Sequence, residues 1–415
     1  MTTSTPSEAT PMPSRRRLLQ YGAAALPVLA LGAAPPAAAH AAAADAATTD
    51  CAPSVDSQSV SAAPGLRMPA ETDRHDRTFM AWPALSSIWG SQLSAVRDDI
   101  ARVAYAISRY EPVVVVARPG QAADARYWLG RGGAYGITVL EIPNDDLWIR
   151  DFGPTFLTAP GAVAGLDTNF NGWGKSGTSY YQPYAEDAAV AATLLYDYGV
   201  DRVRAPFTGE GGALETDGQG TLLATVSSLV NPNRNPGMTQ DQVEQALKSS
   251  LGLSKVIWLP GLAGQDITDD HIDCLARFTA PGRVILDQPG PGTAQIWIDV
   301  YQQSKQILAN ATDAQGRPLV VTELPGPDRQ LIRGRGRGRG RGKDFLSSYT
   351  NYYTANGAVF VPQFGDGYAD GTAYAILQAE FPGRDIVQVN IDNIASGGGG
   401  IHCATQSQPS VPPVV

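Results

Sequence analysis

One cysteine near the C-terminus lies in a stretch that could present a nucleophile. Cys403 follows four consecutive glycines at 397–400 and the dipeptide Ile401-His402. Glycine is used where the backbone must adopt a positive φ or let another group approach closely. The stretch therefore predicts a thiol presented to a ligand. The alternative is a flexible tail that carries a buried structural cysteine.

Few histidines could serve as a base for this thiol. His40 lies in an N-terminal segment that we expect to be removed. In an extended segment, His402 would point to the opposite face from its neighbour Cys403. If a cysteine–histidine pair does the chemistry, His271 is the favoured base.

The sequence around His271 predicts a strand. Residues 269–274 read Asp-Asp-His-Ile-Asp-Cys. Alternation along a strand would place His271 and Asp273 on one face and Cys274 on the other. Because Cys274 would face away and the chain has no Cys-x-x-Cys spacing, we expect no zinc site built from His271, Asp273, Cys274 and Cys403.

Two acidic segments could hold a cationic ligand. Residues 144–154 place three aspartates and Arg150 around Trp148, and glycines flank Glu210 in residues 209–215. Taken singly, each segment would be interpreted as an ordinary loop. Together with a thiol and a histidine, they suit attack on a carbon that is already cationic. A guanidinium is such a target, because carboxylates match its N–H donors bidentately and a tryptophan can stack on its plane.

The elements that would position these residues alternate between helix and strand. Apolar periodicity predicts helices near 92–109, 122–129, 185–198, 239–251 and 372–381. Predicted strands lie at 112–117, 137–142, 222–226, 255–259, 283–286, 296–300, 319–323, 358–362 and 386–390, the last of the chain. Thr239 and Gln242 form a capping box, and Gly252 ends that helix. The alternation indicates an α/β fold, and no repeat at a fixed period distinguishes a doubly wound sheet from a repeat arrangement.

The N-terminal region differs from the rest of the chain. Three arginines at 15–17 precede an apolar run at about 21–34, which Pro27 interrupts. This pattern is typical of a twin-arginine export signal, and the run is shorter than the roughly 20 residues of a membrane span. We expect a signal segment at 1–45, a disordered lead at 46–65 and a catalytic domain at 66–410. The mature protein would be extracellular or in the cell envelope, without a membrane span.

Arginine and glycine alternate in a low-complexity tract at 333–342. The formal net charge of the chain is −9, and without the five arginines of this tract it would be −14. Such acidity favours cationic ligands, and we expect no nucleic acid as a partner. We interpret the tract as a solvated loop, and the alternative is a binding arm for an anionic surface.

Eight short segments carry a resemblance to a known family. They are MPAE at 68–71, WIRDFGP at 148–154, FNGWG at 170–174, EGG at 210–212, NRNP at 233–236, HID at 271–273, VPQFGD at 361–366 and GGIHCATQ at 399–406. In this order they resemble the agmatine deiminases and the related bacterial, Porphyromonas-type peptidyl-arginine deiminases, which are guanidino-group-modifying enzymes. The resemblance covers residues from about 66 to 409.

The resemblance implies a five-bladed, pseudo-symmetric α/β propeller of ββαβ units around a central active site. The implied site comprises Cys403 as nucleophile, His271 as general acid/base, Asp151, Glu210 and Asp273 as carboxylates that hold the guanidinium, and Trp148 as part of the pocket. We expect no cofactor and no metal.

The implied reaction is hydrolysis of a guanidinium to a ureido group and ammonia. Agmatine is the favoured substrate and N-carbamoylputrescine the product. The alternative substrate is the arginine side chain of a peptide or protein, which export would suit. Two residues depart from the usual agmatine deiminase pattern, since Gly400 replaces an asparagine and Ser407 a glutamine. A Cys-His amide hydrolase is a more remote alternative, because it would not need three carboxylates.

Overall fold

The computed structural model describes residues 65–332 and 345–414. The predicted export segment at 1–45, all but the last residue of the lead at 46–65, and the tract at 333–342 lie outside these ranges. Export and the loop interpretation therefore stay predictions. Among the described residues, no helix combines the length and the apolar character needed to cross a membrane.

Four small sheets share one plan, in which two antiparallel strands precede a helix and a third strand that pairs parallel with the second. The first two are β4 (Thr155–Ala159), β5 (Ala162–Asp167), α5 (Asp187–Asp197) and β6 (Asp201–Arg204), then β7 (Glu215–Thr216), β8 (Thr221–Thr225), α7 (Gln240–Leu251) and β9 (Lys255–Leu259). The next two are β10 (Ala276–Ala280), β11 (Arg283–Gln288), α8 (Gln295–Asn310) and β12 (Val320–Pro325), then β13 (Tyr353–Ala355), β14 (Ala358–Pro362), α9 (Gly367–Glu380) and β15 (Asp385–Val389).

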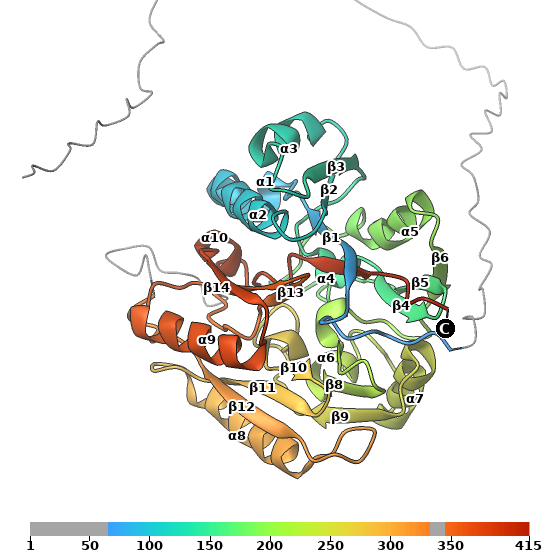
Figure 1. Cartoon of the computed structure of the whole chain (residues 1–415), viewed down its shortest axis with the longest axis vertical. Coiled ribbons are helices and arrows are strands. Elements are labelled where there is room, and N and C mark those ends of the chain that lie inside the picture. Colours follow the sequence, from blue (N-terminus) through green and yellow to red (C-terminus); the bar gives the residue numbers. More distant parts are fainter. Residues whose placement is uncertain (1–64, 333–344, 415) are drawn as a thin grey trace, which may run out of the picture. The chain divides into compact units, whose positions relative to one another are not determined.

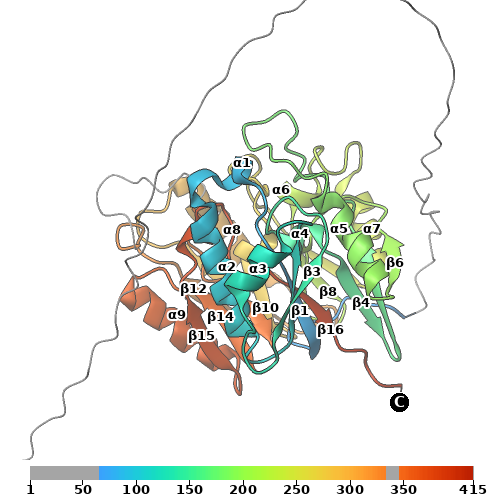
Figure 2. The ribbon, with the colours of Figure 1, turned by 90° about the horizontal axis from the view of Figure 1, so that it is seen from above.

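A fifth sheet joins the two ends of the described chain. Its elements are β16 (Gln406–Pro409), β1 (His75–Ala81), α2 (Leu93–Ile107), β2 (Val113–Ala117), α3 (Ala122–Leu129) and β3 (Ile137–Glu141). β16 pairs antiparallel with β1, and the two strands lie side by side in Figure 2. β2 and β3 extend the sheet in parallel (Figure 1). The C-terminal strand thus takes the place that the first strand has in the other four sheets.

The five sheets surround a common centre, with α2, α5, α7, α8 and α9 on the outside (Figure 1). This is the five-bladed α/β propeller of ββαβ units that the resemblance implied. The remaining short helices are α1 (Ser86–Trp89), η1 (Gly90–Gln92), α4 (Ile149–Phe152), η2 (Gly211–Ala213), α6 (Val226–Leu229), η3 (Ile272–Cys274) and α10 (Asp392–Ala395).

Apolar periodicity explains why the helices form where they do. In α2, Val96, Ile100, Val103 and Ile107 recur every three or four residues and are fully buried. All five residues of β2, which follows α2, are buried as well. Burying one such aliphatic side chain stabilises the fold by about 1.5–3 kcal/mol, so this stripe fixes α2 against its sheet.

Most predicted elements are confirmed, and the capping box of Thr239 and Gln242 is formed. The strand predicted at 296–300 is wrong, because these residues belong to α8, whose buried Val300, Ser304 and Leu308 recur at helical spacing. The strand at 386–390 is β15 but not the last, since β16 follows. β16 is polar in sequence and becomes a strand by pairing with β1, which local periodicity does not reveal.

Candidate active site

Each sheet contributes a polar side chain to the centre from the segment just before its first strand. In chain order these residues are Asp151 before β4, Glu210 before β7, Asp273 before β10, Asn351 before β13 and Cys403 before β16. Each of these segments leads directly into a paired strand, so the pairing of that strand fixes the position of the segment. The propeller therefore brings together five side chains that lie far apart in the sequence.

Cys403 lies in a turn between α10 and β16 and is 4% exposed. We predicted an extended segment here, but residues 401–404 form a turn. Asn351 holds this turn, because its Oδ1 accepts from the backbone N–H groups of His402 and Cys403 at 3.1 and 3.3 Å. The Sγ of Cys403 lies 3.2 Å from Nδ2 of Asn351 and 3.5 Å from Oδ2 of Asp273. The thiol thus faces other site residues rather than bulk solvent.

The glycines before Cys403 make room for aromatic rings. A Cβ on Gly399 would lie 2.3 Å from the ring of Trp148, and one on Gly397 would lie 2.3 Å from the ring of Trp89. A Cβ on Gly400 would lie 2.4 Å from Oδ1 of Asn351. Gly397 and Gly399 therefore let the loop pack against the two tryptophans, and Trp148 is buried beside it. The predicted presentation of the thiol to a ligand stays a prediction.

His271 caps the one-turn helix η3 and does not lie in a strand, so the predicted alternation is wrong. Its Nε2 lies 3.2 Å from Oε2 of Glu210, and its Nδ1 lies 3.7 Å from Oδ1 of Asp151. Among the described residues, no hydrogen bond satisfies this Nδ1. A Cβ on Gly212 would lie 2.6 Å from the same nitrogen, so only glycine keeps the space in front of it free.

Cys274 does not face away from the site, because η3 turns its side chain back toward Cys403. Its Sγ donates to Oδ1 of Asp273 at 3.3 Å and lies 3.4 Å from Nδ2 of Asn351. The ligand atoms of Asp273, Cys274 and Cys403 all lie within 4.8 Å of one another, and His271 is not part of that group. The argument that Cys274 faces away on a strand, which we used against a zinc site, is therefore wrong. The set of His271, Asp273, Cys274 and Cys403 is nevertheless not brought together, because His271 lies outside the group.

Buried donors orient the two carboxylates that contact His271. Trp173 donates its indole N–H to Oδ2 of Asp151 at 2.9 Å, and the backbone N–H of Gly212 donates to Oδ1 at 3.1 Å. Arg234 donates from Nε to Oε1 of Glu210 at 2.9 Å. Donors of the scaffold therefore hold both oxygens of Asp151 and one oxygen of Glu210, whose other oxygen faces His271.

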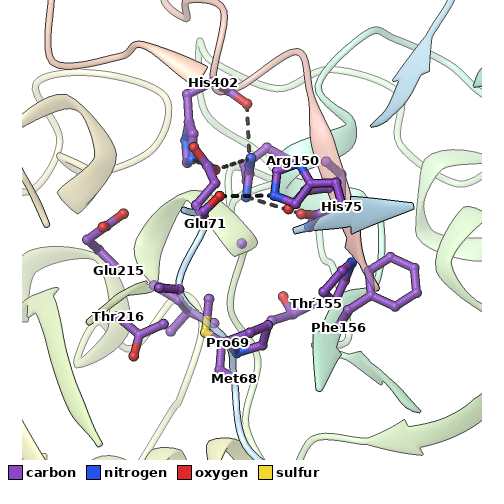
Figure 3. A pocket seen from close by; sticks show the side chains of 16 residues that line it. Met68, Pro69, Glu71, His75, Arg150, Thr155, Phe156, Glu215, Thr216 and His402 are labelled. Atoms are coloured by element: carbon purple, nitrogen blue, oxygen red, sulfur yellow. Dashed lines mark hydrogen bonds and ion pairs between the residues drawn. The ribbon is translucent and has the colours of Figure 1, made fainter. Parts of the chain in front are cut away.

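A second set of charged residues, which sequence reasoning missed, supports the loop of Cys403. The ring of His402 lies 2.8 Å from Oδ2 of Asp273 through Nδ1 and 2.8 Å from Oε2 of Glu71 through Nε2. Glu71 also accepts from Arg150 at 2.7 Å (Figure 3). It accepts from Arg277 at 2.9 Å as well. Glu71 belongs to the MPAE segment at 68–71, and this segment was the feature of the sequence that could have pointed to Glu71 as a site residue.

The small cavity beside Glu71 does not accommodate a substrate. It measures about 40 Å³ and is lined by Met68, Glu71, Arg150 and His402 among others (Figure 3). A buried water already needs at least about 10–15 Å³ of such space, so this cavity holds only a few waters. Figure 3 therefore shows a structural network behind the loop of Cys403.

Neighbouring charges set the protonation of His271. Burial disfavours its charged form, but Asp151 and Glu210 outweigh burial and raise the pKa of His271 to about 9. Burial raises the pKa of Asp151 to about 6, although His271 acts in the opposite direction. Burial would also raise the pKa of Glu210, but Arg234 holds it below its usual value. At neutral pH, His271 is an imidazolium and Asp151 is mostly a carboxylate.

The surroundings of Cys403 favour the protonated thiol. A hydrogen bond with Cys274 lowers its pKa, but burial and the carboxylates of Asp273 and Asp151 outweigh that bond and raise it. Burial would raise the pKa of Asp273, but the hydrogen bond and charge of His402 hold it below its usual range. The centre therefore combines a neutral thiol with a permanent carboxylate beside it.

A larger cavity of about 360 Å³ lies next to this centre, on the side of Cys274. Cys274 lines it, next to Cys403, and Gly398 of the glycine run lines it as well. Its other walls include Asp266, Asp270, Asp287, Tyr180, Trp297 and Tyr301. Carboxylates and aromatic rings on its walls suit a cationic ligand.

Comparison with known proteins shows relatives along the whole propeller. A family model described as Porphyromonas-type peptidyl-arginine deiminase matches residues 67–409. An agmatine deiminase from Pseudomonas aeruginosa is 37% identical over 369 residues, which cover 85% of this chain and 98% of that protein. One from Stutzerimonas stutzeri is 37% identical over 362 residues, which cover 83% and 96%.

A solved structure agrees with these matches. The structure described as agmatine deiminase of Enterococcus faecalis catalyzing its reaction has a TM-score of 0.75 and 34% identity, and the match covers 83% of this chain and 96% of that one. The family match spans all five sheets and the turn that carries Cys403. The chain therefore belongs to the Porphyromonas-type peptidyl-arginine deiminase family.

Proposed function

We propose that this protein is a cysteine-dependent deiminase that hydrolyses agmatine to N-carbamoylputrescine and ammonia. The observation that carries the proposal is the buried centre in which the thiol of Cys403 lies beside Asp273 while Asp151 and Glu210 hold His271 as an imidazolium. A thiol, a proton donor and several carboxylates in one site are what the attack on a cationic guanidinium carbon requires.

In this proposal, Asp151 and Asp273 bind the guanidinium. Carboxylates accept its N–H groups in charge-assisted hydrogen bonds, which favour a cation over a neutral amide. The cation also offsets the negative charge that raised the pKa of Cys403. Cys403 then loses its proton to solvent, and the thiolate forms when the substrate is in place.

The first half of the reaction releases ammonia. The thiolate of Cys403 attacks the guanidinium carbon and forms a C–S bond, which gives a neutral tetrahedral adduct. His271 donates its Nδ1 proton to one of the amino groups, and the C–N bond to that group breaks as ammonia leaves. An amidino-thioether cation on Cys403 and a neutral His271 remain.

The second half restores the enzyme. Neutral His271 takes a proton from a water molecule as the oxygen attacks the amidino carbon. Collapse of this adduct breaks the C–S bond and expels the Cys403 thiolate, and the hydroxyl proton leaves to form ammonium with the released ammonia. The product is a ureido group, and His271 is again an imidazolium.

The choice of agmatine has two supports. The relatives at 37% identity are named agmatine deiminases and match over almost their whole length. The cavity beside Cys274 carries carboxylates and aromatic rings, which suit a small dication better than the neutral backbone of a peptide. Peptidyl-arginine, which the description of the family model names, remains the alternative that an assay must separate.

The test compares three substrates on the purified protein. Agmatine, free arginine and an arginine-containing peptide are incubated separately, and ureido product and ammonia are measured, with Cys403→Ala as the blank. We expect turnover of agmatine and at least a hundredfold lower kcat/KM for the other two. Turnover of the peptide in preference to agmatine would assign protein-arginine deimination, and ammonia from none of the three would refute deimination.

A further inference from the structure

Two consecutive aspartates precede His271, and both have left-handed backbone conformations, with φ of 62° at Asp269 and 66° at Asp270. The carboxylate of Asp269 is fully engaged. It accepts from Lys175 at 2.7 Å, from Arg234 at 2.6 Å and from the backbone N–H of Gly264 at 2.7 Å. Asp269 thus holds this loop in place.

Among the residues that the structure describes, the hydrogen bonds of Asp270 come from its backbone. Its carbonyl oxygen accepts from the hydroxyl of Thr225 at 2.7 Å, and its N–H donates to Asp266 at 3.2 Å. The residue is 5% exposed, yet within residues 65–332 and 345–414 its Oδ2 has no hydrogen-bond partner. A buried carboxylate oxygen without a partner costs free energy unless a ligand satisfies it.

The unpartnered carboxylate belongs to the wall of the 360 Å³ cavity. Each of the two other aspartates of that wall has one oxygen engaged, since Oδ1 of Asp287 accepts from the hydroxyl of Ser348 at 2.6 Å and Oδ1 of Asp266 accepts from the hydroxyl of Thr268 at 2.8 Å. Among the described residues, Asp270 is the wall aspartate with a buried oxygen that has no partner, and this oxygen can accept from a ligand.

The cavity that Asp270 lines comes close to the reacting groups at Cys274. Cys274 lines it and lies beside Cys403, and Asp270 directly precedes His271. Tyr180, Trp297 and Tyr301 supply aromatic walls, against which methylene groups pack. A ligand with its guanidinium at Cys403 can thus place an aliphatic chain in the cavity.

We propose that Asp270 binds the terminal ammonium of the substrate and so selects guanidines that carry a primary amine at the end of an aliphatic chain. The inference rests on the proposed deiminase function and adds the residue that recognises the far end of the substrate. Burial raises the pKa of Asp270 well above its usual value, and the neighbouring Asp266 adds to this effect. A bound ammonium opposes both effects and favours the ionised carboxylate.

The test uses Asp270→Asn with two substrates that differ at one end. Agmatine carries the terminal ammonium, and butylguanidine has the same four-carbon chain without it. Loss of a hydrogen bond to a charged group should raise KM for agmatine about 10- to 100-fold. The values of kcat for agmatine and kcat/KM for butylguanidine should change by less than about threefold.

Two further variants control the result. A substitution at position 270 must tolerate the left-handed backbone conformation, with φ of 66°, and asparagine does so. Asp270→Gly provides a second test, because glycine adopts this conformation freely. Asp287→Asn removes another carboxylate of the same wall whose oxygen Ser348 already occupies. We expect it to shift the agmatine KM much less than Asp270→Asn does.

The outcomes separate this inference from the proposed function. If the wild type does not deiminate agmatine, the proposed function fails. If it does, and Asp270→Asn slows both substrates equally, Asp270 supports the fold or the reacting groups and the recognition of the ammonium is refuted. An agmatine KM unchanged in both Asp270 variants would also refute it.

Discussion

Buried carboxylates determine the protonation of both reacting groups. Asp151 and Glu210 keep His271 charged, and Asp151 and Asp273 disfavour the thiolate of Cys403 until a cation enters. The site therefore combines a proton donor, His271, with a thiol that its surroundings keep neutral. A bound guanidinium lowers the pKa of the Cys403 thiol again, because its positive charge offsets the negative charge of the carboxylates. Such an arrangement ties nucleophile activation to the presence of the correct substrate.

This charge arrangement predicts a bell-shaped pH dependence of kcat/KM for agmatine. Below about pH 6, Asp151 is protonated, because its pKa is raised to about 6, and it no longer attracts the guanidinium. Above about pH 9, His271 loses the proton that the leaving ammonia needs. Initial rates at subsaturating agmatine measure both limbs, with circular dichroism to verify folding at each pH. A flat profile across both pKa values would contradict the assignment.

One-turn elements, rather than long helices or strands, carry the reacting groups. Trp148 caps α4, Glu210 caps η2 and His271 caps η3, and each short helix leads into the first strand of a sheet. Such a turn reverses the chain within a few residues, so a side chain at its start can point to the centre while the strand extends outward. Close contact between these turns leaves room only for glycine at Gly212.

Substituting Gly212 tests this close contact. In Gly212→Ala, the new Cβ would lie 2.6 Å from Nδ1 of His271 and 2.8 Å from Oδ1 of Asp151, so the imidazole must move. A displacement of about 1 Å at a catalytic group can cost about 100-fold in rate, and we expect at least that loss in kcat/KM. Steady-state kinetics with agmatine measure it.

Gly371 provides the matched control. It lies exposed in α9 and has no atom within 4 Å of its hypothetical Cβ. Because alanine favours a helix interior, Gly371→Ala should increase the free energy of unfolding by about 0.5–1 kcal/mol and leave the activity unchanged. Equal activity of the two variants would show that the space at Gly212 is not needed.

At the scale of the whole molecule, closure of the ring positions the nucleophile. β16 begins three residues after Cys403 and pairs with β1, so the two ends of the described chain hold the catalytic turn between them. Glu71, close to the N-terminal end, adds an ion pair with Arg277 and contacts His402 beside the nucleophile. A site at the centre of the propeller therefore depends on both ends of the chain.

Truncation at the C-terminus tests the closure. Deleting residues 407–415 removes the pairing of Ser407, Gln408 and Pro409 with β1. Several lost hydrogen bonds at about 0.5–1.5 kcal/mol each should lower the free energy of unfolding by about 3 kcal/mol, and activity should fall more than about 100-fold as Cys403 loses its support. Deleting only 413–415 keeps β16 and should preserve activity. A 407–415 deletion with wild-type kinetics and melting would refute this role of closure.

Local sequence patterns were enough to predict several of the outer helices and the chemical types of the site residues. Apolar spacing predicted α2, α3 and α7 nearly to the residue, because each buries one continuous face. The short segments around Cys403, His271 and Glu210 predicted a thiol, a base and carboxylates for a guanidinium. Local sequence could do this because these signals depend on residues a few positions apart.

How these residues meet depends on contacts between distant segments of the fold. The strand predicted around His271 is a one-turn helix, which brings Cys274 toward Cys403, and β16 is a strand only because β1 lies beside it. The partnership of His402 with Glu71 and the unpartnered oxygen of Asp270 likewise depend on residues outside their own segments. Contacts between distant segments arise from ring closure and packing, and no local periodicity encodes them.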